Sequence, residues 1–224
     1  MTGPTSTPTV SSRIHSALRA DILTGRFAPG EAMPSERRLS EELGASRHAV
    51  REALKRLQEA GLVAISQGGA TRVLDWRRHG GLDLILDGDV PPELHAARAT
   101  MEMRACIGAD AARLCAARAT SEQRAQLLAR VEQLAAVEHP AARNAHYEVM
   151  WDLIVDGADN IAYRLALTTL VAQQRVASVA PEAVARELED VEAIRALARA
   201  IAGGDGERAH DAARDLLDRS IPDD

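Results

Sequence analysis

The sequence is short of aromatic residues and of cysteines, and both shortages narrow the choice of fold. Only 2% of its residues are aromatic although 46% are hydrophobic, so small aliphatic side chains must fill the core. That composition favours close packing of helices over a β-sandwich. The two cysteines, Cys106 and Cys115, are nine residues apart, on opposite faces of one predicted helix, where they cannot form a disulfide with each other. We expect both to be small buried apolar residues, reduced as in a cytoplasm.

Long apolar runs and targeting signals are also missing. No stretch approaches the length of a membrane-spanning helix, and the N-terminus lacks the charged-then-apolar pattern of a signal peptide. The sequence contains no Gly-rich phosphate loop, no nucleophile elbow, no HExxH and no Cys-x2-Cys pair. We therefore expect a cytoplasmic protein that has no membrane partner and is not an enzyme.

Acidic residues dominate the chain as a whole, but not its first third. The formal net charge is −6, which alone argues against binding to nucleic acid. Residues 1–78 nevertheless hold 12 Lys and Arg against 8 Asp and Glu, whereas the remaining residues hold 15 against 25. Only residues 1–78 therefore carry a net positive charge that favours binding to the phosphates of nucleic acid.

A basic helix face is predicted within residues 33–73. Arg47, Arg51 and Lys55 recur every four residues on the second of two short helices joined by a tight turn, so they share one face. A basic face on the second helix of a helix-turn-helix is what the reading of a DNA major groove requires. The alternative is that the three cations only solvate an exposed face.

Caps, turns and apolar periodicity predict a mostly α fold with two folded domains. In the first third we expect a helix from Ser11 or Ser12 to Thr24, a second after Ser35 with Leu39 and Leu43 inward, a third from Ser46 to Gly61, and a β-hairpin "wing" over 62–66 and 71–74. Beyond Pro92 we expect helices over about 92–118, 120–138, 142–155, 160–179, 181–202 and 206–220. The domains predicted are a disordered tail (1–10), a winged helix-turn-helix (11–75), a linker (76–92) and an all-α bundle of six to seven helices (93–221).

Residues 11–75 resemble the winged helix of the bacterial GntR family of transcription regulators. They carry nearly the whole run AxLRxxIxxGxFxPGxxMPSExxLSxxLGxSRxxVREALxxLxxxGLV. The second half resembles the FadR-type (FCD) ligand-sensing domain through RATMEMRACIGADAARLCAARAT, DGADN and AIAGGDGERA. The resemblance implies a homodimer that binds a palindromic double-stranded DNA operator, with a small-molecule effector in each bundle.

Members of the family contact DNA from the second helix, the recognition helix and the wing tip. The resemblance places these contacts at Arg37, Ser46, Arg47, His48, Arg51, Gln67 and Gly68. The chemistry agrees, because arginine can donate two hydrogen bonds to guanine, and a helix N-terminus suits a phosphate. Glycine in the wing lets its backbone approach the duplex closely.

The metal site of many FCD domains is not matched here. The positions of the family's Asp-x3-His pair fall on Tyr147 and Trp151, and those of the later ligands fall near Ile194 and Leu216. None of these side chains can hold a metal as the family does, so we expect no metal and no cofactor.

Four residues are candidates for effector binding: Arg104, Tyr147, Trp151 and Asn160. Arg104 lies in an apolar stripe with no carboxylate three or four residues away, so it needs either a distant Asp or Glu or an anionic ligand. Tyr147 and Trp151 combine an apolar body with a polar tip. Asn160 could instead cap a helix.

Two functions therefore stay open. The first is a regulator, expected to be a repressor, whose operator affinity depends on an anionic effector such as a carboxylate or an acyl-CoA-like metabolite. The alternative is a dimeric DNA-binding regulator without a ligand, whose helical domain only assembles the dimer.

Overall fold

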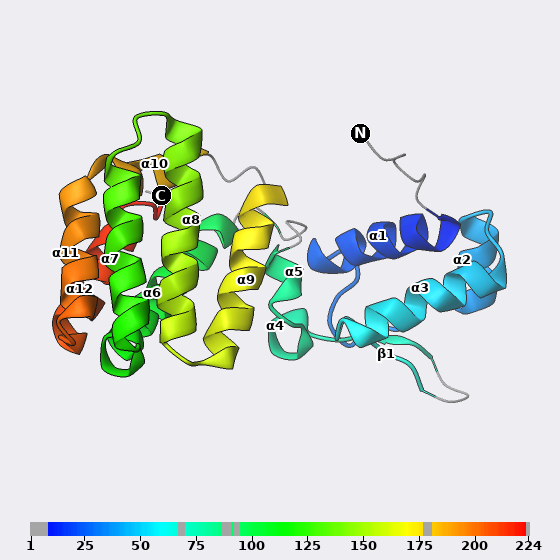
Figure 1. The fold of residues 1–224 in the computed structure, drawn as a ribbon. Coiled ribbons are helices and arrows are strands. Elements are labelled where there is room, and N and C mark those ends of the chain that lie inside the picture. The colour runs from blue at the N-terminus through cyan, green and yellow to red at the C-terminus, as the bar shows by residue number, and fades with distance from the viewer. Residues whose placement is uncertain (1–8, 67–69, 87–90, 92–94, 177–180, 223–224) are drawn as a thin grey trace. The chain divides into compact units, whose positions relative to one another are not determined.

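The chain folds into two compact units, residues 1–94 and residues 95–224. The structure is a computed structural model that describes residues 9–66, 70–86, 91, 95–176 and 181–222 (Figure 1). Most of the predicted tail lies outside the described residues, but Thr9 and Val10 already belong to the first helix and its cap. The wing-tip residues Gln67 and Gly68 also lie outside the described residues.

The first unit contains three helices, α1 (Val10–Leu23), α2 (Glu36–Glu42) and α3 (Arg47–Glu59). Each begins at a hydroxyl cap, since the side chains of Thr9, Ser35 and Ser46 each accept a hydrogen bond from a backbone amide in the first turn. Helix α1 packs on α3, and α2 packs on α3 as well, so α3 is held from two sides. The expected helix-turn-helix is thus present.

One face of α3 supplies the centre of this core. Val50, Ala53, Leu54 and Leu57 are almost fully buried, together with apolar residues of α1 and of the wing. Leu43 was expected to face inward with Leu39, and this is wrong: α2 ends at Glu42, and Leu43 is its C-cap with 43% of its surface exposed.

The wing is a two-stranded antiparallel sheet of β1 (Val63–Ala64) and β2 (Arg72–Val73). Val63 pairs with Val73, and Ala64 pairs with Arg72, which also forms an isolated bridge to Ala32. Both valines are buried, so the wing is anchored to the core at its base.

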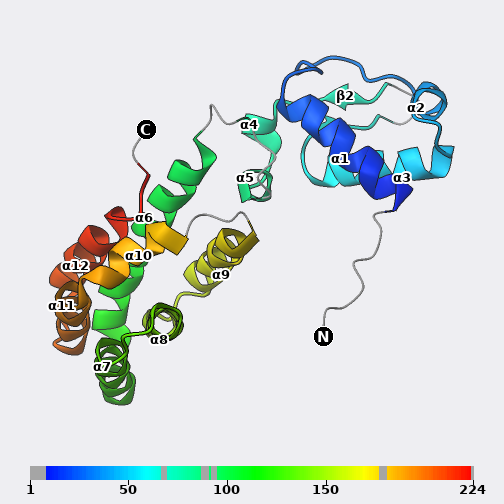
Figure 2. The same ribbon diagram turned by 90° about the horizontal axis from the view of Figure 1, so that it is seen from above.

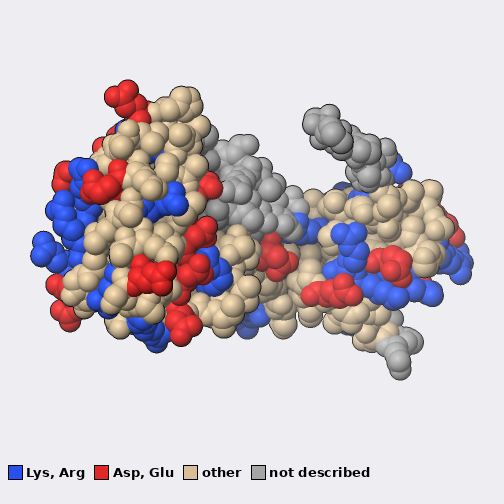
Figure 3. All heavy atoms as spheres, in the orientation of Figure 1, with Lys and Arg blue, Asp and Glu red and all other residues tan. Residues whose placement is uncertain are grey.

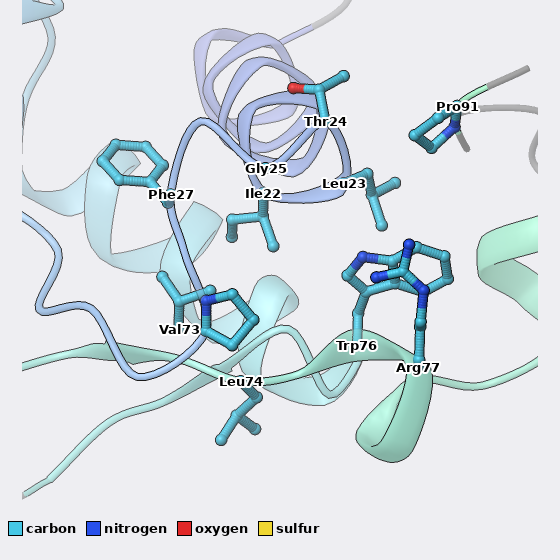
Figure 4. A pocket seen from close by; sticks show the side chains of 11 residues that line it. Ile22, Leu23, Thr24, Gly25, Phe27, Val73, Leu74, Trp76, Arg77 and Pro91 are labelled. Carbon is cyan, nitrogen blue, oxygen red and sulfur yellow. The ribbon is translucent and has the colours of Figure 1, made fainter. Parts of the chain in front are cut away.

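Residues 76–86 were expected to be part of a linker. They contain two short helices, α4 (Trp76–His79) and α5 (Asp83–Leu86). Leu84 is 1% exposed and belongs to the core of the first unit. Trp76 lines a hollow of about 180 Å³ with the end of α1 and the strand β2, and the guanidinium of Arg77 lies 4.6 Å from the centre of its ring system (Figure 4).

In the described part of the second unit, seven helices form a bundle. They are α6 (Ala96–Arg118), α7 (Ser121–Ala135), α8 (Pro140–Gly157), α9 (Ile161–Val176), α10 (Pro181–Glu189), α11 (Val191–Ala202) and α12 (Gly206–Asp218). The long helix α6 contacts α8, α9, α11 and α12 (Figures 1 and 2). The mostly α fold class with a small wing and a helical second half is therefore confirmed. Among the described residues, no helix is both long and apolar enough to span a bilayer.

Helix boundaries in this unit follow capping chemistry. Helix α7 begins with a capping box, in which the side chains of Thr120 and Gln123 each accept a hydrogen bond from the other's backbone amide. The single helix expected over 181–202 is wrong, because Asp190 leaves the helical conformation and its side chain caps α11 through the amide of Ala193.

Glycines allow α8 to approach α6 closely. A Cβ atom added to Gly157 of α8 would lie 2.6 Å from the sulfur of Cys115 on α6. On α6 itself, a Cβ added to Gly108 would lie 2.5 Å from the Leu217 side chain of α12, so a glycine also lets α12 come close. Both cysteines were expected to be buried. This is confirmed for Cys115 and wrong for Cys106, which is exposed on the opposite face of α6.

Candidate nucleic-acid interface and buried carboxylate cluster

The outer face of α3 carries the predicted cations. Burial of Val50, Leu54 and Leu57 fixes the rotation of the helix, and this places Arg47 and Arg51 in the solvent. Lys55 is exposed too and forms an ion pair with Glu52 at 3.0 Å. The basic face predicted from the four-residue spacing is therefore real.

Arg51 is held by a carboxylate from the preceding helix. Its Nε and Nη2 atoms donate to the carboxylate of Glu36, with an Nη2–Oε2 distance of 2.7 Å. The hydrogen bond from Arg51 is the main cause that lowers the pKa of Glu36, and the charge of Arg47 adds to it. Only one edge of the guanidinium is used in this way, so Nη1 stays available to a partner in solution.

The other predicted DNA contacts that the structure describes lie on α2 and at the start of α3. Ser46 caps α3 by accepting from the amide of Ala49 at 3.2 Å, which leaves its hydroxyl proton free to donate. His48 is exposed on the first turn, and Arg37 follows Glu36 on α2, where it pairs with Glu41 at 3.1 Å. Within the described part of the chain, Arg47 has no hydrogen-bond or ion-pair partner.

Basic and acidic side chains alternate over the surface of the first unit (Figure 3). Arg38 pairs with Glu42 at 2.7 Å, in the same way as Arg37 pairs with Glu41. Arg56, on the last turn of α3, donates to Ser12 of α1 at 3.3 Å. Arg56 therefore ties α1 to α3, whereas Arg47 is left for a partner that the described chain does not supply.

In the second unit, Arg104 meets a carboxylate inside the bundle. Its Nη1 and Nη2 atoms donate to Oε1 and Oε2 of Glu187 at 2.6 and 2.9 Å. The side chains of Arg104 and Glu187 are 8% and 0% exposed. Burial acts to lower the pKa of Arg104, but the Glu187 carboxylate offsets this, so the pKa ends above its usual value.

Two hydroxyl groups complete the coordination of this carboxylate. Tyr147 of α8 donates to Oε2 of Glu187 at 2.5 Å, and Ser220, after the end of α12, donates to Oε1. Burial, and then the charge of Glu187, raises the pKa of the Tyr147 hydroxyl well above its usual range. We call Arg104, Tyr147, Ser220 and Glu187 the carboxylate cluster.

Trp151 stands beside the cluster, one turn after Tyr147. The two rings meet edge to face, with centroids 6.2 Å apart. The indole Nε1 of Trp151 is buried and has no hydrogen-bond partner among the described residues. Ile154, one turn further on, is fully buried, so this face of α8 points into the bundle.

Asn160, the fourth candidate, caps a helix. Its Oδ1 accepts from the amides of Ala162 and Tyr163 at 3.1 and 3.3 Å, at the start of α9. A capping role was the alternative to effector binding that the sequence left open for Asn160. The structure links Arg104, Tyr147 and Trp151 to one another and shows no contact from Asn160 to that cluster.

The described residues contain no group of three His, Cys, Asp or Glu side chains placed to hold a metal ion. His146 accepts a hydrogen bond from Arg130 at 3.1 Å, and His210 contacts its neighbour Asp211. The helix position where the family places its Asp-x3-His pair holds the Tyr147–Trp151 pair instead.

The sequence did not reveal the partners of the two key arginines. Neither Glu36 nor Glu187 stands out from the sequence as the partner of an arginine. The need of Arg104 for an anion was the available signal, but it could not choose one carboxylate among 33 acidic residues.

Comparison with protein families matches both halves of the chain. Residues 10–73 match the model for bacterial regulatory proteins of the gntR family, and residues 99–219 match the FCD domain. The first model covers helices α1 to α3 and the wing, and the second covers almost all of the helical unit.

Individual proteins are similar to this chain over its whole length or over part of it. The HTH-type transcriptional regulator Mce2R of Mycobacterium tuberculosis is 37% identical, covering 96% of this chain and 91% of its own. The fatty acid metabolism regulator protein of Yersinia pestis is 38% identical over 33% of each chain. Among solved structures, Lar, which controls the expression of the Listeria monocytogenes agr system, has a TM-score of 0.50 at 16% identity and covers 96% of both chains, a likeness of fold alone.

Proposed function

Because this chain belongs to the gntR family of bacterial regulatory proteins and is a DNA-binding transcription regulator of the FadR type, we propose how it acts. It binds a palindromic operator as a homodimer in the cytoplasm and represses transcription. An anionic small molecule, bound in the helical unit, changes the affinity for the operator. The observation that carries the proposal is the basic face of α3, with Arg47 unpaired and Arg51 held in place by Glu36.

On the DNA side, each residue has a role that its chemistry allows. Arg47 and Arg51 enter the major groove and donate to guanine, because their guanidinium groups match the two acceptors of that base. Ser46 and the free amides of the first turn of α3 bind a backbone phosphate. Arg37 and His48 contact the flanking backbone, and Gln67 and Gly68 of the wing tip approach the duplex beside it.

On the effector side, Arg104, Tyr147 and Trp151 supply the binding groups, whereas Asn160, proposed from the sequence as a fourth, serves as the cap of α9. The cluster supports an anionic effector because a buried arginine requires a negative partner. Effector binding shifts the population between two arrangements of the dimer that hold the recognition helices at different spacings. The second candidate, a regulator without an effector, is favoured by the fact that Glu187 already neutralises Arg104.

The DNA-binding proposal is tested by fluorescence anisotropy with the promoter region of the protein's own operon. We expect the double variant Arg47→Ala plus Arg51→Ala to lose operator affinity by about 100-fold, since each base contact is worth roughly 5- to 100-fold. The matched control is Arg26→Ala plus Arg78→Ala, which removes the same charge from exposed positions outside α3. Equal losses in the two double variants would refute a role in base recognition.

The effector proposal is tested separately by thermal unfolding of the full chain with small acids and acyl-CoA compounds. A ligand that binds only the folded state raises Tm in proportion to the logarithm of its concentration. Ligands that raise Tm are then added to the anisotropy assay. A ligand that raises Tm without changing operator affinity would support the second candidate, in which the helical unit does not control DNA binding.

A further inference from the structure

The carboxylate cluster has the composition of a ligand site. Three elements contribute only donors: Arg104 from α6, Tyr147 from α8 and Ser220 from the turn after α12. The acceptor, Glu187, comes from α10, a helix of nine residues that contacts α8. Two of the donors therefore belong to the long helices α6 and α8 and the third follows α12, whereas the anion comes from a short helix.

The donor geometry fits a carboxylate in particular. Each carboxylate oxygen of Glu187 receives one bond from the guanidinium and one from a hydroxyl: Oε1 from Arg104 and Ser220, and Oε2 from Arg104 and Tyr147. Four donors thus saturate two oxygens in the planar arrangement that a guanidinium imposes.

The buried arginine cannot be left without an anion. The side chain of Arg104 is 8% exposed, so its charge lacks solvation from water. Other ion pairs of the helical unit differ in this respect: the acids that face Arg164 and Arg195 are more than 60% exposed and can separate at little cost. If Glu187 leaves, another carboxylate must take its place.

We propose that Arg104, Tyr147 and Ser220 form a carboxylate-binding site that the chain's own Glu187 occupies, and that a carboxylate effector competes with Glu187 for it. This inference rests on the proposed function in that the helical unit binds an effector. Trp151 extends the site, since its buried Nε1 donor has no partner among the described residues and can serve a second polar group of the ligand. Displacing Glu187 releases the end of α10 from α6, α8 and α12 together.

The test is chemical rescue with acetate, the smallest ligand that carries the carboxylate and a methyl group. Glu187→Ala removes the tethered carboxylate and opens space beside Arg104. We expect Tm to fall by about 10 °C, as is typical when one partner of a buried ion pair is removed. Acetate at about ten times its Kd then restores about 4 °C, whereas acetamide, of the same shape without charge, restores nothing at equal ionic strength.

Wild type and a double variant make the test specific. In wild type the tethered carboxylate competes at a millimolar or higher effective concentration, so acetate gives no gain over acetamide. The double variant Arg104→Met plus Glu187→Leu replaces the ion pair by apolar groups, which proteins tolerate. Its Tm should not change when acetate is added. The same acetate shift in wild type as in Glu187→Ala would overturn the proposed competition.

If Glu187→Ala does not fold in plain buffer, the comparison is made as the fraction refolded from urea in acetate and in acetamide. Equal refolding in the two would overturn the proposed site, including the case in which neither restores the fold. Operator binding by wild type, measured by anisotropy, reports on the proposed function independently. Loss of rescue with intact operator binding rejects this inference alone, whereas rescue without operator binding rejects the proposed function alone.

Discussion

Glu36, in the first turn of α2, holds Arg51 of α3 by three hydrogen bonds across 15 residues of sequence. Because the carboxylate takes only the Nε and Nη2 edge, it orients the guanidinium while leaving Nη1 free. For Glu36→Gln we expect operator affinity to fall by roughly 3- to 10-fold, since the oriented arginine becomes free to rotate. Affinity for unrelated DNA should not fall, because the variant removes a negative charge from a phosphate-binding face.

The control for that variant is Glu42→Gln, which makes the same charge change on the same helix but releases Arg38. Both variants are titrated with operator DNA and with a scrambled duplex at one salt concentration. The expected signature is a lower ratio of specific to non-specific affinity for Glu36→Gln only. An equal change of this ratio in both variants would mean that Glu36 acts through charge and not by orienting Arg51.

The two tyrosines provide a matched pair for the energetics of the carboxylate cluster. Tyr147 donates to buried Glu187 at 2.5 Å, and Tyr163 donates to Asp110 at 3.0 Å near the surface. We expect Tyr147→Phe to lower the free energy of unfolding by about 2 kcal/mol, because it removes a hydrogen bond to a buried charge. Tyr163→Phe should stay within about 0.5 kcal/mol of wild type in the same urea titration.

The sequence was sufficient for most of the local structure, because caps and apolar periodicity act over a few residues. The helix starts after Ser35, Ser46 and Thr120 follow from a side-chain oxygen accepting a nearby amide. Helix α1 begins at Val10, earlier than the expected Ser11 or Ser12, because Thr9 caps it. The split between α10 and α11 was missed, although Asp190 is itself a capping residue, since the apolar pattern continues through it.

The sequence was insufficient for the contacts that join distant segments. The pairing of Arg104 with Glu187 spans 83 residues, and nothing in the local pattern distinguishes Glu187 from the other acidic residues. Cys106 shows a different limit. Two cysteines nine residues apart on one helix face opposite ways, and the sequence does not show which faces of α6 its neighbours cover, so it did not reveal that Cys106 is exposed.

Gly61 is the glycine of the first unit where substitution should cost most. Its φ is +71°, and a Cβ there would lie 2.1 Å from the carbonyl oxygen of His79, a backbone atom. For Gly61→Ala we expect a loss of about 3 kcal/mol or more in the free energy of unfolding. Gly25, with φ of +80° and open space around it, is the control. Gly25→Ala should cost only about 1 kcal/mol, and equal losses would show that backbone strain, not the contact with His79, is the limiting factor.

The two cysteines should differ sharply in reactivity. Burial raises the pKa of the Cys115 thiol to about 11, whereas Cys106 is exposed. At pH 8 we expect a thiol reagent to modify Cys106 rapidly and Cys115 only when the protein unfolds, because the thiolate is the reactive form. Cys106→Ser should abolish the fast phase and leave the slow phase unchanged.

Cys115 also makes stability fall at alkaline pH. The folded protein holds this proton more tightly than the unfolded chain does, because the pKa of an unburied cysteine thiol is near 9.0. Its contribution to stability is therefore complete below about pH 9 and is lost as the pH rises toward 11, the pKa of this thiol in the folded protein.

Urea titrations across this range should show the free energy of unfolding of wild type declining from about pH 9. In Cys115→Ser the decline should begin about one pH unit higher, where Tyr147, with its raised pKa, starts to contribute. Identical profiles for the two proteins would contradict this assignment to Cys115.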